Sequence, residues 1–276
     1  MRHADIPAGM RLKKIAGWNQ EQADWEMILG AAGPEDCIVT VRGGRVVGTT
    51  TALSYGRGCT WIGMVLVDPE FRRLGIATRM LGRIMHRVGS CEAVRLDATP
   101  AGRAVYRREG FAADWDLERL TCRCLPAVDA PDEKITSITE PDIAEVVELD
   151  REVFGYDRVP VLRQLRERSE DCAWKIERGG RVHGFCLGRP GTGYHQLGPV
   201  VAPTSEEAIT LIQAAMQGLR GRSVVLDVPH ARTGLTEWLS DQGFIAQRTL
   251  TRMTLGGQLE TSPHPHYFAI AGPELG

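Results

Sequence analysis

An internal repeat is the feature that most constrains the fold, because four short segments of the first half recur in the second half in the same order and at similar spacing. The matching pairs are Val47-Gly48 with His183-Gly184, WIGMVLV (61–67) with HQLGPVV (195–201), VRLDA (94–98) with VVLDV (224–228), and Gly110-Phe111 with Gly243-Phe244. The length of 276 residues is near the upper limit for one core and is sufficient for two ordinary domains. We therefore predict a duplicated α/β unit and not a solenoid of short repeats.

The stretch LPAVDAPDEKIT (125–136) is the best candidate for a boundary between the two units. It is rich in proline, alanine and acidic residues and has no apolar period. We expect an N-terminal domain at 1–125, a linker at 126–138 and a C-terminal domain at 139–276.

Hydrophobic periodicity predicts the same mixture of elements in each half. The first half is expected to begin with an antiparallel meander of three strands (37–41, 45–54 and 60–67). A helix (75–88), a strand (93–98), a short helix (101–109) and a last strand from 110 onward follow. The second half is expected to begin with helices at 140–153 and about 158–168. Three strands, a helix at about 204–218, a strand SVVLDV, a helix near 231–241 and a strand from Gly243 complete it.

Composition excludes several classes of function. The chain has 43% hydrophobic and 25% charged residues and a net charge of −2, which disfavours nucleic acid or a membrane surface as the main partner. Its seven cysteines are scattered without a CxxC pair, so neither a disulfide framework nor a zinc site is indicated. We find neither a signal peptide nor a membrane-spanning run, and we expect a cytoplasmic protein.

The segment VDPEFRRLGIATRML (67–81) predicts an anion site. Two arginines, a glycine and an alanine stand where an apolar strand turns into a helix, and the first turn of a helix presents unpaired N–H groups and the positive end of the helix dipole. The segment lacks the Gly-Lys-Ser/Thr end of a P-loop and is not a GxGxxG sequence opening a βαβ unit. What remains is R-x-x-G-x-A, from Arg72 to Ala77.

This pattern resembles the signature Q/R-x-x-G-x-G/A of the GNAT superfamily of N-acetyltransferases, which use acyl-CoA. A second motif of that family follows about 30 residues later as LDATPAGRAVYRREGF, with Tyr106 four residues before Gly110. The segments LDREVFGYDR (149–158) and AIAGPELG (269–276) resemble bacterial tandem GNAT proteins with an altered second domain. The resemblance implies two tandem GNAT-like domains, each a mixed, mostly antiparallel sheet flanked by helices, and acetyl-CoA as cosubstrate without a metal.

The first motif contains the residue types that a pyrophosphate site needs. Small residues at 75 and 77 let the backbone approach the phosphates, N–H groups from 73 to 78 point at their oxygens, and arginines add charge. Arg79, Arg83 or Arg87 either reaches a ribose phosphate or forms a solvated face. By the resemblance, the pantetheine arm lies in a splay between strands 60–67 and 93–98. The expected cofactor-binding residues are Val65, Val67, Arg72, Arg73, Leu74, Gly75, Ile76, Ala77, Thr78 and Thr99.

The resemblance implies that an amine attacks the thioester and that the leaving thiolate takes a proton from Tyr106. The alternative for Tyr106 is packing of its short helix onto the sheet. For a general base, Asp97 and Glu70 are the candidates, with deprotonation through ordered water as an alternative. Asp97 is equally suited to bonding local backbone at a strand end.

The segment AGWNQEQADW (16–25) is expected to form one wall of the acceptor pocket. Trp18 and Trp25 stand among acidic residues and would suit an amine, although the pair would equally anchor a helix to the core. Asn19 is a candidate cap for the following helix. The acidic residues are Glu21, Asp24 and Glu26.

The second half departs from the motif at the functional positions. Glu206 and Glu207 stand where a phosphate would lie, and Leu239 replaces the tyrosine, so we expect no CoA there. We expect this half to wall in the acceptor through 154–158 or 194–196, where His195 is either a ligand contact, a base or a structural residue. The paired histidines at 264 and 266 lack further spaced ligands, so they are poor evidence for a metal.

The leading hypothesis is an acetyl-CoA-dependent N-acetyltransferase that modifies a primary amine of a small molecule, acting as a monomer or homodimer. A protein-lysine acceptor and another acyl donor are variants of it. The alternative from another class is a non-catalytic acyl-CoA-binding sensor, which would need the phosphate cradle but not a positioned phenol.

Overall fold

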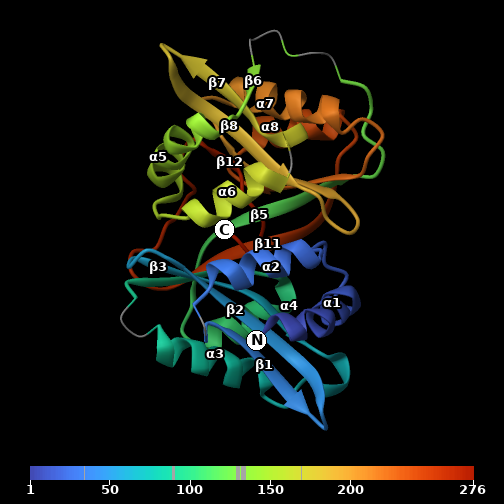
Figure 1. Cartoon of the computed structure of the whole chain (residues 1–276), viewed down its shortest axis with the longest axis vertical. Coiled ribbons are helices and arrows are strands. Elements are labelled where there is room, and N and C mark those ends of the chain that lie inside the picture. The colour runs from blue at the N-terminus through green and yellow to red at the C-terminus, as the bar shows by residue number, and fades with distance from the viewer. Residues whose placement is uncertain (34, 89–90, 129–130, 132–134, 169) are drawn as a thin grey trace.

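The computed structural model describes residues 1–276 except 34, 89–90, 129–130, 132–134 and 169. The described strands form one twelve-stranded sheet in the order β1-β2-β3-β4-β11-β5-β10-β9-β8-β7-β6, with β12 paired to β9 (Figure 1). The two halves therefore share a continuous sheet.

The first half begins with helices and then forms a meander. Its elements are η1 (His3–Asp5), α1 (Ile6–Ile15), α2 (Gln22–Ala31), β1 (Cys37–Arg42), β2 (Arg45–Tyr55), β3 (Cys59–Val67), η2 (Pro69–Phe71), α3 (Ile76–Arg87), β4 (Ala93–Ala98), α4 (Pro100–Arg108) and β5 (Ala112–Cys122). The strands are rich in β-branched residues, and α3 buries one apolar stripe against the sheet while its arginines face outward.

The second half repeats this order and adds one short strand at each end. Its elements are β6 (Ile135–Ser137), η3 (Glu140–Asp142), α5 (Ile143–Phe154), α6 (Val159–Arg168), η4 (Glu170–Cys172), β7 (Trp174–Arg178), β8 (Arg181–Arg189), β9 (His195–Val201), α7 (Ser205–Gly218), β10 (Val224–Pro229), α8 (Thr233–Asp241), β11 (Ile245–Gly256) and β12 (Tyr267–Ala269). The predicted α/β class and the duplication of the unit are confirmed.

The last long strands of the two halves are exchanged. β11 from the second half pairs with β4 on one side and β5 on the other, and β5 from the first half pairs with β10. Each half thus lends the strand that completes the sheet of the other.

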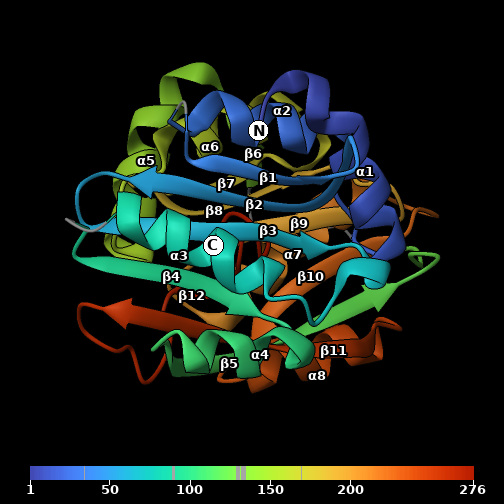
Figure 2. The same cartoon turned by 90° about the horizontal axis from the view of Figure 1, so that it is seen from below.

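Helices cover both faces of the sheet (Figure 2). One face carries α1, α2, α5 and α6, and the other carries α3, α4, α7 and α8. On the first face α2 contacts α6, so helices of the two halves meet there.

The C-terminal segment, residues 270–276, is largely buried between the halves, near the centre of Figure 1. The Tyr55 hydroxyl donates to the carbonyl of Leu275 at 2.8 Å, and the Trp61 indole donates to the carbonyl of Pro273 at 3.0 Å. One hydrophobic cluster contains residues from α1 and α2, from α5 and α6, and from this segment. The two halves consequently share a core as well as a sheet.

The region expected to be the linker is only partly free of structure. Residues 129–130 and 132–134 lie outside the described part of the chain, and the end of the expected linker forms β6. The domain boundaries at 125 and 139 stay predictions. Among the described residues, no helix combines the length and apolar character that crossing a membrane requires.

Candidate functional site

The loop that follows β3 is anchored by a buried carboxylate. Asp68 accepts from Arg11 at 2.7 Å and from Arg45 at 2.6 Å, and it caps η2 by accepting from the N–H of Glu70. The hydrogen bond from Arg11 is the largest effect that lowers the pKa of Asp68, and burial opposes it. Asp68 fixes the start of the loop that leads to α3.

The end of this loop forms a backbone cradle at the N-terminus of α3. Arg73 and Gly75 have φ angles of 62° and 71°, and Gly75 is the N-cap without a side-chain cap. Among the described residues, the backbone N–H groups of 73–78 have no acceptor, whereas the backbone N–H of Arg79 donates to the carbonyl of Gly75. The left-handed conformation at 75 needs glycine, and the free N–H groups suit an anion.

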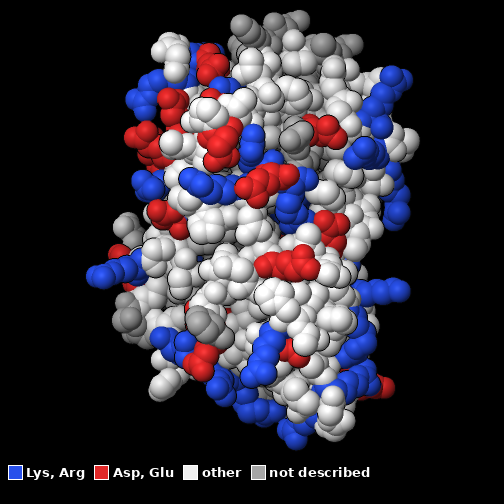
Figure 3. All heavy atoms as spheres, in the orientation of Figure 1, with Lys and Arg blue, Asp and Glu red and all other residues white. Residues whose placement is uncertain are grey.

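Arginines surround the cradle, but they have different partners. Arg72 donates to the carbonyl of Val67 at 3.3 Å, and a Cβ at residue 75 would lie 3.2 Å from the Arg79 guanidinium. Arg87 pairs with Glu35 and Asp36, which engages it away from the expected ribose phosphate. Lys and Arg gather on the lower part of the face in Figure 3, over the first half.

β3 and β4 separate at their carboxyl ends. Their parallel pairing covers only Cys59–Trp61 with Ala93–Arg95, although both strands continue. Beyond that point β3 has one extra residue opposite β2, with Met64 at φ 50°, and such bulges recur next to active sites. Val65 and Val67 lie half-buried along this opening.

Tyr106 lies on α4 next to the opening. Its ring packs edge-on against Phe111 with centroids 6.0 Å apart, and it contacts the same hydrophobic cluster as Val65. No hydrogen bond to the Tyr106 hydroxyl is recorded within the described residues, and burial raises the pKa of the phenol. Thr99 caps the same helix by accepting from the N–H of Gly102 at 3.3 Å.

The two carboxylates considered as general bases are both engaged. Asp97 forms a buried bidentate ion pair with Arg252 of β11, with both N···O distances 2.9 Å. Burial raises its pKa and the Arg252 charge opposes that rise. Glu70 is exposed and pairs with Arg45 at 3.3 Å. The geometry of Asp97 favours the structural alternative, with an arginine of the other half in place of local backbone.

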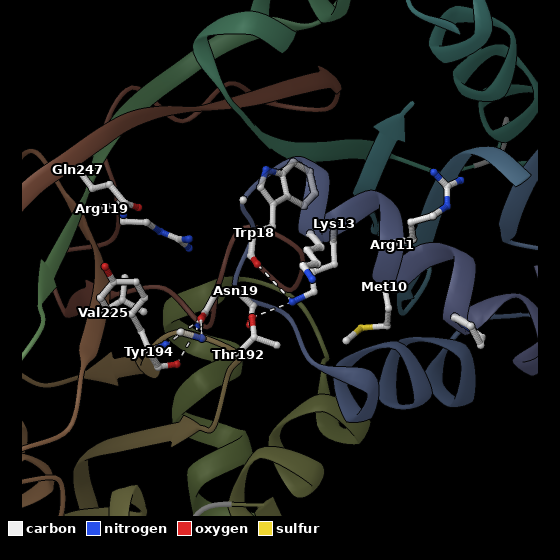
Figure 4. A pocket seen from close by; sticks show the side chains of 14 residues that line it. Met10, Arg11, Lys13, Trp18, Asn19, Arg119, Thr192, Tyr194, Val225 and Gln247 are labelled. Atoms are coloured by element: carbon white, nitrogen blue, oxygen red, sulfur yellow. Dashed lines mark hydrogen bonds between the residues drawn. The ribbon is translucent and has the colours of Figure 1, made fainter. Parts of the chain in front are cut away.

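A cavity of about 650 Å³ lies between the halves on the face that carries α1. In Figure 4, Lys13 and Arg11 of α1 lie opposite Arg119 of β5 and Gln247 of β11; Trp18 lies between them, and Tyr194 lies on the side of Arg119, next to Val225. This volume is in the range of small-molecule sites.

The segment between α1 and α2 forms part of this cavity, but not as expected. Trp18 lines it, whereas Trp25 is buried in the core. Asn19 does not cap α2, whose N-cap is Glu21. The Asn19 side chain instead accepts from the N–H groups of Gly193 and Tyr194 at 3.1 and 3.0 Å, clamping the loop after β8.

The acidic residues of that segment do not present free carboxylates to the cavity. Asp24 pairs with Arg168 and Arg189 at 2.7 and 2.9 Å, and Glu21 pairs with Arg168. Glu26 accepts from Gln22 on the exposed side of the helix. The expectation that these acids hold an amine is not supported by their geometry.

The described residues of the second half form no comparable cradle. Thr204 caps α7 by accepting from the N–H of Glu207 at 3.2 Å, and the buried Glu207 carboxylate pairs with Arg178. A bond from its own backbone N–H lowers the pKa of Glu206. The space equivalent to the opening between β3 and β4 is taken by β12, which pairs with β9, while the N–H of Ile270 donates to the carbonyl of Asp227 in β10.

Of the two second-half segments expected to contact the acceptor, only one reaches the cavity among the described residues. Tyr194 lines it, while Phe154 and Arg158 are buried against the C-terminal segment. His195 lies beside Arg222, with 3.1 Å between ring and guanidinium nitrogens, and burial together with that charge lowers its pKa. Within the described chain, no group of three or more His, Cys, Asp or Glu residues is arranged to hold a metal.

Both halves match family models. Residues 11–111 match the acetyltransferase (GNAT) family, and residues 146–269 match an acetyltransferase (GNAT) domain. An uncharacterized N-acetyltransferase of Bacillus subtilis, YitH, is 30% identical over 202 residues, covering 73% of this chain and 71% of the relative. The chain belongs to the GNAT acetyltransferase family.

A further relative and two solved structures are also similar to this GNAT protein. A holothin acyltransferase of a Pseudoalteromonas species is 28% identical over 231 residues, 83% of this chain and 78% of the relative. A Pyrococcus horikoshii protein crystallised as a candidate acetyltransferase superposes with a TM-score of 0.83 at 22% identity, covering 100% of this chain and 94% of its own. A tandem GNAT protein from the clavulanic acid biosynthesis pathway gives a TM-score of 0.61 at 16% identity, covering 91% and 94%. The GNAT protein is an N-acetyltransferase.

Sequence reasoning missed one carboxylate near the opening of this GNAT protein. A Cβ at Gly63 of β3 would lie 3.0 Å from the carbonyl oxygen of Glu274. One carboxylate oxygen of Glu274 pairs with Arg189, and the other, Oε2, is buried with no partner among the described residues. No spacing in the sequence relates position 274 to position 63, so no signal could have identified this contact.

Proposed function

We propose that this GNAT protein transfers the acetyl group of acetyl-CoA to a primary amine of a small molecule. One observation carries the proposal: Arg11 lines the cavity and also bonds Asp68, the residue that begins the loop to the α3 cradle. The cavity and the loop to the cradle are therefore linked through Arg11 and Asp68, which lies directly after the carboxyl end of β3. A donor held through the opening between β3 and β4 would reach an acceptor in the cavity.

The residues of the chain take distinct roles in this proposal. The N–H groups of 73–78 bind the pyrophosphate, and Arg72, Arg73 and Arg79 add positive charge. Val65 and Val67 offer backbone groups to the amides of the donor arm in the manner of an added strand. The donor supplies the thioester, and Tyr106 holds a proton beside the leaving sulfur. Because Asp97 and Glu70 are ion-paired, the amine loses its proton to solvent.

Replacing Tyr106 with phenylalanine tests the enzyme against the sensor hypothesis. We expect kcat to fall about 100-fold, because general acid catalysis contributes roughly 10²–10⁴, and the Kd of acetyl-CoA to stay unchanged. Thiol release and calorimetry measure the two quantities. Tyr156→Phe, which removes a phenol beside Arg95, is the matched control. Acetyl transfer at the wild-type rate in Tyr106→Phe would refute the assigned role.

The pH dependence of the rate provides a second check. Burial raises the pKa of Tyr106 well above its ordinary value of 10, so the phenol keeps its proton throughout the accessible alkaline range. We expect kcat to rise with pH as the acceptor amine deprotonates and then to stay level up to about pH 10. The measurement is a pH–rate profile corrected for spontaneous thioester hydrolysis. A fall centred near pH 9 would contradict a Tyr106 phenol that stays protonated.

A further inference from the structure

The cavity between the halves has a lining of unusual charge. Four of its lining residues, Arg11, Lys13, Lys14 and Arg119, are cations, and none of the described lining residues is aspartate or glutamate. A cavity meant for a cationic amine alone would offer carboxylates to pair with its charge. The lining therefore points to an occupant with negative charge.

Two of these cations are already neutralised by the protein. Arg11 pairs with Asp68 at 2.7 Å, and Arg119 forms a buried bidentate pair with Asp227 in which both N···O distances are 2.7 Å. Their charges are balanced without a ligand, so the excess positive charge comes from other residues.

Lys13 and Lys14 have no carboxylate partner among the described residues. The buried Nζ of Lys13 donates to the hydroxyl of Thr192 at 2.7 Å and to the carbonyl of Trp18 at 3.5 Å, both neutral groups. Burial lowers the pKa of Lys13, and the negative charges of Asp24 and Glu21 oppose this shift. Both of these carboxylates are paired with Arg168. Lys14 lines the cavity from the exposed side of α1.

Arg248 adds positive charge beside the opposite wall, next to the lining residue Gln247, without itself lining the cavity. A β-bulge at Gln247 places two residues of β11 opposite Arg119, and both Gln247 and Arg119 line the cavity. The Nε of Arg248 is buried without an acceptor in the described structure. Burial and the charge of Arg119 lower its pKa to about 10. Asp227 and Glu274, the acids nearest to it, are committed to Arg119 and Arg189.

Desolvated charges in proteins are normally paired. We infer that the cavity takes an amine that also carries an anionic group, which Lys13 and Lys14 bind while Trp18 and Tyr194 contact its apolar part. The inference rests on the proposed function, because it takes the cavity to be the acceptor site. It names the substrate class as amino acids or other amines with a carboxylate, rather than simple amines.

Three matched pairs of probes test this without requiring turnover. Acetate, benzoate and indole-3-acetate are titrated into the wild type in parallel with acetamide, benzamide and indole-3-acetamide, which have nearly the same shape but no charge. We expect at least one carboxylate to bind more tightly than its amide. Lys14→Glu should weaken the binding of that carboxylate about tenfold, because it removes a charge-assisted contact. The Arg57→Glu control reverses an exposed charge on the turn between β2 and β3 and should leave binding unchanged.

The outcomes separate this inference from the proposed function. If none of the carboxylates binds better than its amide, or if Lys14→Glu binds as the wild type does, the inference is wrong. Calorimetry with acetyl-CoA on the same samples tests the donor site independently. Gly75→Glu, which alters only the cradle, should retain carboxylate binding. If this variant no longer bound the carboxylate, the anion site would lie at α3 and the inference would be wrong.

Discussion

Replacing Gly75 with glutamate is expected to weaken the binding of acetyl-CoA at its one site per chain roughly 100-fold. The new carboxylate would lie at the N-cap of α3, where the free N–H groups of 73–78 are gathered, and would repel a pyrophosphate. Loss of two charge-assisted hydrogen bonds, at about 1.5 kcal/mol each, corresponds to roughly a 100-fold weaker complex. Calorimetric titration measures both stoichiometry and affinity.

Two variants control for effects on folding. Gly82→Glu places the same acid on the exposed side of α3, where a Cβ meets nothing within 4 Å, and should bind acetyl-CoA normally. Gly75→Ala imposes the same backbone strain at φ 71° without the charge. Binding by Gly75→Glu equal to that by Gly82→Glu would remove the main support for a donor site at α3. Two sites in the wild type would contradict the expectation that the second half binds no CoA.

The second large effect is expected from Arg252→Met. Arg252 is buried between the rings of Trp61 and Trp115, with its guanidinium carbon 4.6 and 4.4 Å from the two ring centroids, and pairs with Asp97. Removing it leaves a buried carboxylate without its partner, which costs about 3–5 kcal/mol in the free energy of unfolding. Urea denaturation measures this loss. Because the unpaired Asp97 then has a further raised pKa, the loss should grow as pH rises between the Asp97 pKa of the wild type and that of the variant.

A surface ion pair supplies the comparison. Arg181 and Glu148 are 70% and 59% exposed and lie 3.2 Å apart, so Arg181→Met should cost no more than about 1 kcal/mol. The double variant Asp97→Leu/Arg252→Met should recover much of the stability, because it leaves no buried charge. If Arg252→Met were as stable as Arg181→Met, the pair would not hold the exchanged strands together.

Local patterns predicted the parts of this protein that depend on residues close in sequence. The strand, the tight loop and the helix around Gly75 follow from one short stretch, since a glycine at a left-handed position and an apolar stripe on α3 are local requirements. The repeat predicted two similar units, because buried strands at matching positions need the same apolar residues. The α/β class and family were accordingly within reach of the sequence.

Partners from the other half could not be predicted in this way. Asp97 was expected to bond local backbone or act as a base, but its partner Arg252 is 155 residues away. Exchanging β5 and β11 leaves each strand's alternation of buried and exposed residues unchanged, so either neighbour satisfies the pattern. For the same reason nothing in AGWNQEQADW indicated that Asn19 would clamp a loop of the second half.

The position of β12 gives the two halves different thermodynamic characters. A ligand stabilises the state that binds it according to its free concentration, but a segment of the same chain is always present. The second half therefore carries the strand between β9 and β10 as a permanent part of its folding free energy. In the proposed reaction the first half gains the equivalent strand only when the donor arrives. In the second half the added strand is thus always in place, whereas in the first half the strand forms only when the reactant binds.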